Sequence, residues 1–247
     1  MLQGLYGASI SMQGAAQQHE MIAKNLAHAQ VPGYRRAQVV QGTFQDSVDE
    51  SAEDFASRSS SGVRGVEVVN DFTDGLIEAT GRPFDLAIQG EGFFVLKSED
   101  GQPIYTRNGS FMVNEKGKLV TRDGREVQGK GGPIVIETKE EGNVVSIDSQ
   151  GRITVGESEL GRLKVVSFED QNKLVNVGTT LFQDPDLTAK EIKDVQVSAG
   201  HLERSNVHPV LELVDMIAVQ RRYDAAARTM KLLMKTLEQR INLQRGS

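Results

Sequence analysis

The chain has 247 residues, 38 % hydrophobic and 25 % charged, enough for one large or two small domains with a substantial core. Its net charge of -6 argues against a general nucleic-acid-binding protein, which would carry a basic face. The sequence contains no apolar run of about 18 residues, so no membrane span is predicted. The absence of cysteine excludes disulfides, zinc-thiolate sites and cysteine nucleophiles.

Residues 2–29 are predicted to form a helix with a narrow apolar face. Two sets of residues repeat every seven positions, Leu5, Met12, His19 and Leu26 in one and the smaller Leu2, Ser9, Ala16 and Ala23 in the other. Between Met1 and Tyr34 the only charged side chains are Glu20 and Lys24. A helix enclosed by other protein carries few charges, because a buried charge needs a partner. Packing inside an assembly and a helical hairpin within one monomer both fit this pattern.

The stretch from Arg35 to about Gly65 is polar and has a serine-rich middle, SVDESAEDFASRSSSG. Such a composition is typical of a linker that becomes ordered only on assembly.

From Gly81 to about Gln196, short apolar runs alternate with glycine-bearing turns, which predicts an antiparallel β-domain, a meander or a barrel-like sheet. The predicted strands cover residues 86–88, 93–96, 132–136, 144–147, 163–168 and 181–182. The predicted turns are Glu99-Asp100-Gly101, Glu115-Lys116-Gly117, Arg122-Asp123-Gly124 and Ser149-Gln150-Gly151.

A second helix is predicted between Val207 and Asn242, where there is no glycine and the single proline, Pro209, falls in the first turn. One set of seam residues is Leu213, Gln220, Ala227, Met234 and Ile241, and the other is Met216, Tyr223, Met230, Leu237 and Gln244. Such a helix would be roughly 50 Å long, more than a domain of this size needs for its own core, so much of the stripe is expected to face other molecules. The polar seam residues His19, Gln220 and Gln244 either fix the register or point to solvent.

These elements predict an α+β fold in which the N- and C-terminal helices form a coiled-coil pair and the β-domain is inserted between them. The expected segments are an assembly helix at 1–34, a connecting segment at 35–70, the β-domain at 71–200 and a second assembly helix at 201–247. The residues expected in the assembly seam are Leu5, Met12, Leu26, Leu213, Met216, Tyr223, Met230, Met234 and Leu237.

The sequence offers little support for an enzyme. Gly90-Glu91-Gly92 lacks the third glycine and the following helix of a dinucleotide site, because Phe93 to Leu96 reads as a strand. The four histidines show no metal-ligand spacing, and there is no nucleophile elbow, P-loop or EF-hand loop. We therefore expect no catalytic residue, no cofactor and no metal. The N-terminus also lacks the basic start and apolar stretch of a secretory signal, which by itself would favour the cytosol.

Three segments together resemble the flagellar axial proteins that build the rod and hook of bacteria. They are AKNLAHAQVPGYRR at 23–36, FDLAIQGEGFFVL at 84–96 with its continuation at 105–129, and LERSNVHPVLELVDMIAVQRRYDAA at 202–226. The residues that carry the terminal signatures are Asn25, Gly33, Tyr34, Ser205 and Asn206. His28, Gln30 and Val31 depart from the usual asparagine and threonine of that family.

This resemblance implies a structural role. The short central domain excludes the larger hook protein and the hook-associated proteins. Three segments are closer to the proximal-rod branch than to the distal-rod branch, namely GGPIVI, ESELGRLKVVSFED and LERSNVHPV. The resemblance further implies that the terminal helices pair and pack against neighbouring subunits in an inner tube. It implies partners among the rod proteins, export by the flagellar type III apparatus without a cleaved signal, and a place in the rod across the periplasm. The rival interpretation from the residues is a secreted fibre or tail-like protein.

Overall fold

The computed structural model describes residues 2–41, 66–98, 100–136, 145–156, 158–192 and 194–245. The chain divides into two compact units. A helical unit comprises Met1–Ala27, Ala37–Asp71 and His208–Ser247, and a β-rich unit comprises His28–Arg36 and Phe72–Val207.

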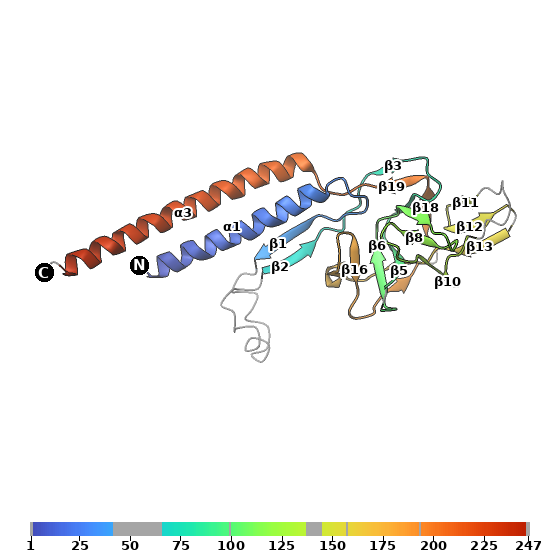
Figure 1. Cartoon of the computed structure of the whole chain (residues 1–247), viewed down its shortest axis with the longest axis horizontal. Helices are drawn as coiled ribbons and strands as arrows, with labels where there is room; N and C mark the ends of the chain where they lie inside the picture. Colours follow the sequence, from blue (N-terminus) through green and yellow to red (C-terminus); the bar gives the residue numbers. More distant parts are fainter. Residues whose placement is uncertain are drawn as a thin grey trace. The chain divides into compact units, whose positions relative to one another are not determined.

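The helical unit is built on two helices that lie side by side, α1 (Leu2–His28) and α3 (Pro209–Arg245) (Figure 1). The predicted position of Pro209 in the first turn is confirmed. The helices run antiparallel, because Gly4 lies against Leu233 near one end of α1 while Asn25 lies against Glu212 near the other. Their contact contains a small apolar cluster in which Ala15, Ile22 and Val219 are buried. The two terminal helices therefore pack on each other within one chain.

The contact face of α1 differs in part from the prediction. The predicted set Leu5, Met12, His19 and Leu26 is half-buried. The second predicted set does not face α3, because its members Ser9, Ala16 and Ala23 are exposed. The residues one position earlier, Ala8, Ala15 and Ile22, are buried instead. Both companion sets have the seven-residue spacing relative to Leu5 and Met12, so periodicity alone could not choose between them.

The contact face of α3 shows the same partial agreement. Met216, Tyr223, Met230 and Leu237 are half-buried, as one predicted set requires. The second set on the contact face contains the buried Glu212 and Val219, one residue before Leu213 and Gln220, which are exposed.

A two-stranded antiparallel ribbon completes the helical unit, formed by β1 (Ala37–Gln41) and β2 (Val66–Asn70). β1 lies inside the stretch that was predicted as a polar linker, and β2 directly follows it, still within the connecting segment expected at 35–70. Its serine-rich middle lies outside the described residues. The valine content of AQVVQ and VEVVN indicates these strands on its own, because β-branched residues are enriched in strands.

The β-rich unit contains a six-stranded antiparallel sheet and several smaller ones. In spatial order the large sheet consists of β15 (Val175–Asn176), β16 (Leu181–Gln183), β6 (Pro103–Thr106), β5 (Phe93–Lys97), β14 (Val165–Ser167) and β17 (Lys190–Glu191). A three-stranded sheet consists of β11 (Val145–Ile147), β12 (Arg152–Val155) and β13 (Ser158–Arg162). The two-stranded pairs are β18 (Gln196–Ala199) with β4 (Leu86–Gln89), β19 (His201–Glu203) with β3 (Ile77–Ala79), β7 (Phe111–Val113) with β8 (Leu119–Thr121), and β10 (Gly132–Pro133) with β9 (Gln128–Gly129). A short 3₁₀ helix, η2 (Gln171–Lys173), precedes β15.

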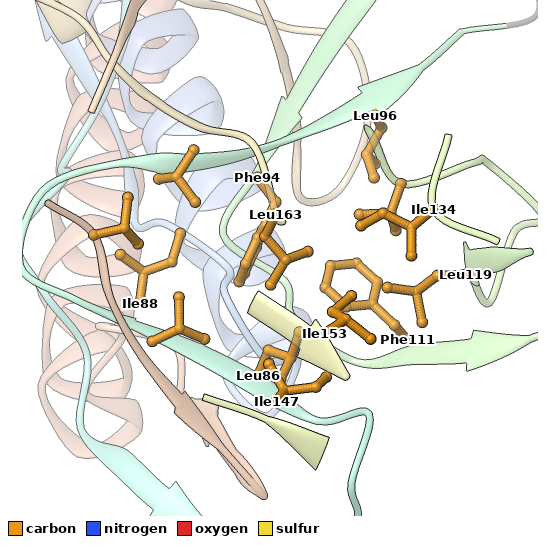
Figure 2. Packing of buried hydrophobic residues seen from close by; sticks show 14 of the residues in the cluster. Leu86, Ile88, Phe94, Leu96, Phe111, Leu119, Ile134, Ile147, Ile153 and Leu163 are labelled. Carbon is orange, nitrogen blue, oxygen red and sulfur yellow. The ribbon is translucent and has the colours of Figure 1, made fainter. Parts of the chain in front are cut away.

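The central strand β5 separates two hydrophobic cores. Successive side chains of a strand point to opposite faces of the sheet. Accordingly Phe94 and Leu96 enter the larger core, which Figure 2 shows with Leu86, Phe111, Ile153 and others. Phe93 and Val95 enter a smaller aromatic core. The members of that second core are Phe93, Val95, Tyr105, Val166, Phe168, Leu174 and Phe182, with Phe72 and Ala189 at its edge.

The predicted turns are confirmed where the structure describes them, although the predicted barrel-like closure is wrong. Gly101, Gly117, Gly124 and Gly151 have φ values of 80°, 74°, 82° and 72°, the left-handed conformation that glycine adopts most easily. Among the described residues the strands form several open sheets, and the six-stranded sheet ends at β15 on one side and β17 on the other.

Candidate functional site

The first signature residue, Asn25, holds the start of β1 within the helical unit. Its side-chain Nδ2 donates to the carbonyl oxygen of Ala37 at 2.9 Å, and its Oδ1 accepts from the Ala37 N–H at 3.0 Å. The same amide also donates to Glu212 Oε2 at 3.4 Å. Asn25 is buried, so it satisfies backbone groups that would otherwise be unpaired in the interior. An asparagine at this position thereby fixes both β1 and the first turn of α3 to α1.

Gly33, the second signature residue, is required by its surroundings in the β-rich unit. Its φ is 67°, and a Cβ atom there would lie 2.4 Å from the backbone nitrogen of Asn108. Its N–H donates to the carbonyl oxygen of Glu203 at 2.8 Å. Only glycine permits this close approach of two backbones in a left-handed conformation.

Tyr34 fills a small apolar cluster beside this turn. The cluster comprises Ala29, Tyr34 and Val207, with Val31 at its edge. The ring of His28 lies 5.2 Å from that of Tyr34, centroid to centroid. His28 and Val31 depart from the signature that the N-terminal segment resembles, yet they pack against Tyr34, which matches that signature.

Arg35 and Glu203 form a buried ion pair that the sequence did not reveal. Arg35 Nη2 donates to Glu203 Oε1 at 2.8 Å, and the two side chains are 0 % and 2 % exposed. Arg35 Nη1 also donates to the carbonyl oxygen of Thr73 at 3.0 Å, and the N–H of Gly75 donates to Glu203 Oε1 at 2.9 Å. The pair thus connects the signature turn, the segment before β3, and β19.

A second arginine shares this carboxylate. Arg107 Nη1 lies 3.5 Å from Glu203 Oε2, while its Nη2 donates to Asp74 Oδ1 at 3.2 Å and to the carbonyl oxygen of Gly90 at 2.7 Å. Burial lowers the pKa of the Arg107 guanidinium and the charge of Arg35 adds to that shift, whereas the carboxylates of Glu203 and Asp74 oppose it. The cluster contains two cations and two anions, so its charges balance.

The C-terminal signature residues Ser205 and Asn206 shape the backbone between β19 and α3. Ser205 Oγ accepts from the N–H of Val207 at 3.1 Å, a local turn contact. Asn206 Oδ1 accepts from the Arg36 N–H at 2.7 Å, and its Nδ2 donates to the carbonyl oxygen and the hydroxyl of Thr73 at 3.2 and 3.1 Å. In the β-rich unit both terminal signatures therefore meet at the segment that contains Thr73.

Apolar side chains also lie exposed on α3, away from its contact with α1. The exposed fractions are 72 % for Val210, 60 % for Leu211, 47 % for Leu213, 58 % for Val214 and 57 % for Ile217. Five large apolar residues within the first turns of one helix form a patch of the kind that marks a protein–protein contact. We call these five residues the α3 patch. Of the residues predicted for the seam, Leu213 lies in this patch, and Met234, also exposed, lies further along α3.

The described residues contain no group of three or more His, Asp or Glu side chains that could hold a metal ion. The helices of the described part are also too short or too polar to cross a membrane.

Comparison with known proteins agrees with this arrangement. Residues 87–155 match the family model described as the flagellar hook protein FlgE/F/G D1 domain, and residues 198–242 match that of the flagellar basal body rod FlgEFG protein C-terminal. The chain is 32 % identical to flagellar basal-body rod protein FlgF of Caulobacter vibrioides, with 85 % of both chains covered. The chain belongs to the flagellar basal-body rod protein family.

Two further relatives show how far the similarity extends along the chain. Flagellar basal-body rod protein FlgG of Buchnera aphidicola subsp. Baizongia pistaciae is 30 % identical, with 91 % of this chain and 93 % of the relative covered. Flagellar basal-body rod protein FlgF of Salmonella typhimurium is 31 % identical, with 89 % of each covered. Because relatives named FlgF and FlgG match at similar identity, these figures do not separate the two branches. The family is one of structural proteins and is not known as an enzyme family.

Proposed function

We propose that this chain is a structural subunit of the bacterial flagellar basal-body rod that polymerises through α1 and α3 to transmit torque. The observation that carries the proposal is the α3 patch. Its five apolar side chains are between 47 % and 72 % exposed in the single chain, and burying the exposed part of each would contribute roughly 0.7–2 kcal/mol. A helix that already packs one face on α1 and shows a second apolar face fits a subunit with neighbours on several sides.

The predicted seam residues fit this role as coiled-coil positions between subunits. In a tube of interlocked helices, each knob must leave its hole before subunits can slide, so the contacts resist shear under torque. Leu5, Met12 and Leu26 on α1, with Met216, Tyr223, Met230 and Leu237 on α3, supply one half-buried stripe per helix. Leu213 and Met234 lie outside that stripe and remain available to a neighbour.

Within the rod, we assign the chain to the proximal segment, with the distal rod protein as the alternative. The sequences GGPIVI at 131–136, ESELGRLKVVSFEDQNKLVNVGTTLF at 157–182 and LERSNVHPV at 202–210 support this assignment. We further propose that the subunit is exported by the flagellar type III apparatus without a cleaved signal, and that it occupies the part of the rod that crosses the periplasm, next to other rod proteins.

Deletion of the gene followed by electron microscopy of isolated basal bodies tests this function. Loss of a proximal rod protein should stop the axial structure inside the periplasm before any hook forms. Loss of a distal rod protein should leave a longer rod stub. Protein counting in wild-type basal bodies should find several copies per flagellum, whereas complete flagella without the chain would overturn the proposal.

A further inference from the structure

The chain passes from α1 into the β-rich unit, and from that unit to α3, through two short segments that are hydrogen-bonded to each other. We call residues 33–36 the entry segment and residues 203–206 the exit segment, and both belong to the β-rich unit. The Gly33 N–H donates to the carbonyl oxygen of Glu203 at 2.8 Å, so the two backbones are in direct contact. The chain between the entry and exit segments therefore forms a closed loop.

Side chains of the two segments add further bonds to this closure. The Arg36 N–H donates to Asn206 Oδ1 at 2.7 Å, and the Arg35 guanidinium donates to the Glu203 carboxylate at 2.8 Å, where both side chains are buried. Both segments also hold Thr73, whose carbonyl oxygen accepts from Arg35 Nη1 at 3.0 Å and from Asn206 Nδ2 at 3.2 Å. Thr73 lies just after the point at which the chain returns from β2 to the β-rich unit. The entry segment, the exit segment and this return point are thus fastened together.

The entry and exit segments run in the same direction, because Gly33 is bonded to Glu203 and Arg36 to Asn206. Tension that arrives through α1 pulls the entry segment toward its first residue, whereas tension that arrives through α3 pulls the exit segment toward its last. The segments must then slide past each other in opposite directions, so their hydrogen bonds are loaded together and not one after another. One of these bonds joins two buried charged groups, and a charged hydrogen bond is about twice as strong as a neutral one. This arrangement resists separation of the chain ends.

We propose that the entry and exit segments form a mechanical lock, which bears tension passing between α1 and α3 and shields β1, β2 and both hydrophobic cores of the β-rich unit from it. The inference rests on the proposed function for the source of the tension, a rod that transmits torque. As long as the bonds of the lock hold, the closed loop behind them carries no load. The lock also gives a reason for burying Arg35 with Glu203, since apolar packing could replace a buried ion pair without loss of stability.

Single-molecule pulling of the full-length chain tests the lock. The natural chain contains no cysteine, so one cysteine appended at each end attaches the handles. The last event should release the loop of 170 positions at once, roughly 560–610 Å, because an extended residue spans at most about 3.3–3.6 Å. Asn206→Ala removes the acceptor of the Arg36 N–H and should shorten the lifetime of this event at constant force roughly three- to tenfold. Asn114→Ala, which removes an acceptor of two backbone N–H groups inside the loop, should leave that lifetime unchanged.

A second pulling geometry separates a lock from a general loss of stability. Asp100→Cys with Gln150→Cys, in the full-length chain, places the handles on two exposed turns inside the loop. Tension between these positions does not cross the entry and exit segments. Adding Asn206→Ala should therefore leave the unfolding lifetime unchanged in this geometry, although it shortens the lifetime when the ends of the chain are pulled.

Two kinds of result would overturn the lock. One is a last event that releases clearly fewer residues than the loop contains, because the sheets would then unravel before the two segments part. The other is an equal effect of Asn206→Ala in both geometries, or equal effects of Asn206→Ala and Asn114→Ala when the ends are pulled. Pulling needs no rod, so either result would leave the rod function standing. Absence of the natural chain from basal bodies would refute the rod function and leave the pulling results unchanged.

Discussion

Replacing Glu203 with glutamine should strongly destabilise the β-rich unit. The Glu203 carboxylate faces two guanidiniums, Arg35 at 2.8 Å and Arg107 at 3.5 Å, and all three side chains are at most 3 % exposed. Glu203→Gln keeps the shape but removes the negative charge, so two buried cations are left with the half-exposed Asp74. Breaking a buried pair in this way costs about 3–5 kcal/mol, which corresponds to a fall in melting temperature of roughly 6–20 °C for a domain of this size.

The matched control for this variant lies on the neighbouring strand. Glu78 forms an ion pair with Arg204 at 3.5 Å, but the side chains are 57 % and 50 % exposed. Glu78→Gln should therefore cost less than about 1 kcal/mol. Differential scanning calorimetry of the full-length proteins measures both changes, and a double-mutant cycle with Arg35→Gln measures the coupling between the charges. Similar melting temperatures for Glu203→Gln and Glu78→Gln would refute the reasoning.

Three further substitutions test other parts of the chain. Gly33→Ala should cost at least about 2 kcal/mol, because the added Cβ meets backbone at 2.4 Å, whereas Gly81→Ala, with φ 72° and open space around it, should cost about 1 kcal/mol in thermal unfolding. Asn25→Leu removes both the acceptor of the Ala37 N–H and the donor to the Ala37 carbonyl oxygen, so the Ala37 amide should exchange hydrogen at least tenfold faster; unchanged exchange would contradict the proposed clamp. Leu237→Asp should abolish motility, since it places a charge in the helical seam, but it should leave export and the melting temperature of the β-rich unit unchanged. Normal swimming would show that the seam is assigned to the wrong face.

The order of the elements could be predicted because its signals are local. Both helices and the glycine turns follow from periodicity and from residues such as Gly117 and Gly151 that permit a left-handed backbone. Of the strands, β4, β5, β10, β11, β14 and β16 were predicted, and the other, mostly short strands were missed. The choice between Ala15 and Ala16 for the α1 contact could not be predicted, since both have the required spacing. That choice depends on how deeply the partner helix approaches, which is a property of the folded pair.

The buried ion cluster was missed for a related reason. Arg35 follows Gly33 and Tyr34 in the N-terminal signature, and Glu203 is the second residue of the C-terminal one, so both residues stood inside recognised segments. Charged residues are mostly exposed, and a sequence does not show that two of them, 168 positions apart, meet in the interior. Neither residue stands between apolar neighbours, since Arg36 follows Arg35 and Arg204 follows Glu203, so no local signal marks the pair.

The unequal cores of the two units bear on how such a subunit could assemble. The β-rich unit has two cores and a buried ion cluster of its own, whereas the helix contact has one small cluster, in which Ala15, Ile22 and Val219 are buried. Most helical stability in proteins comes from packing of an apolar face, so α1 and α3 should gain stability when neighbouring subunits cover the α3 patch. A single neighbour covers part of that surface and several cover all of it. Addition of a subunit at a growing end, where several neighbouring subunits are already in place, is therefore favoured over pairing in solution. This preference would keep free chains monomeric until they reach the rod.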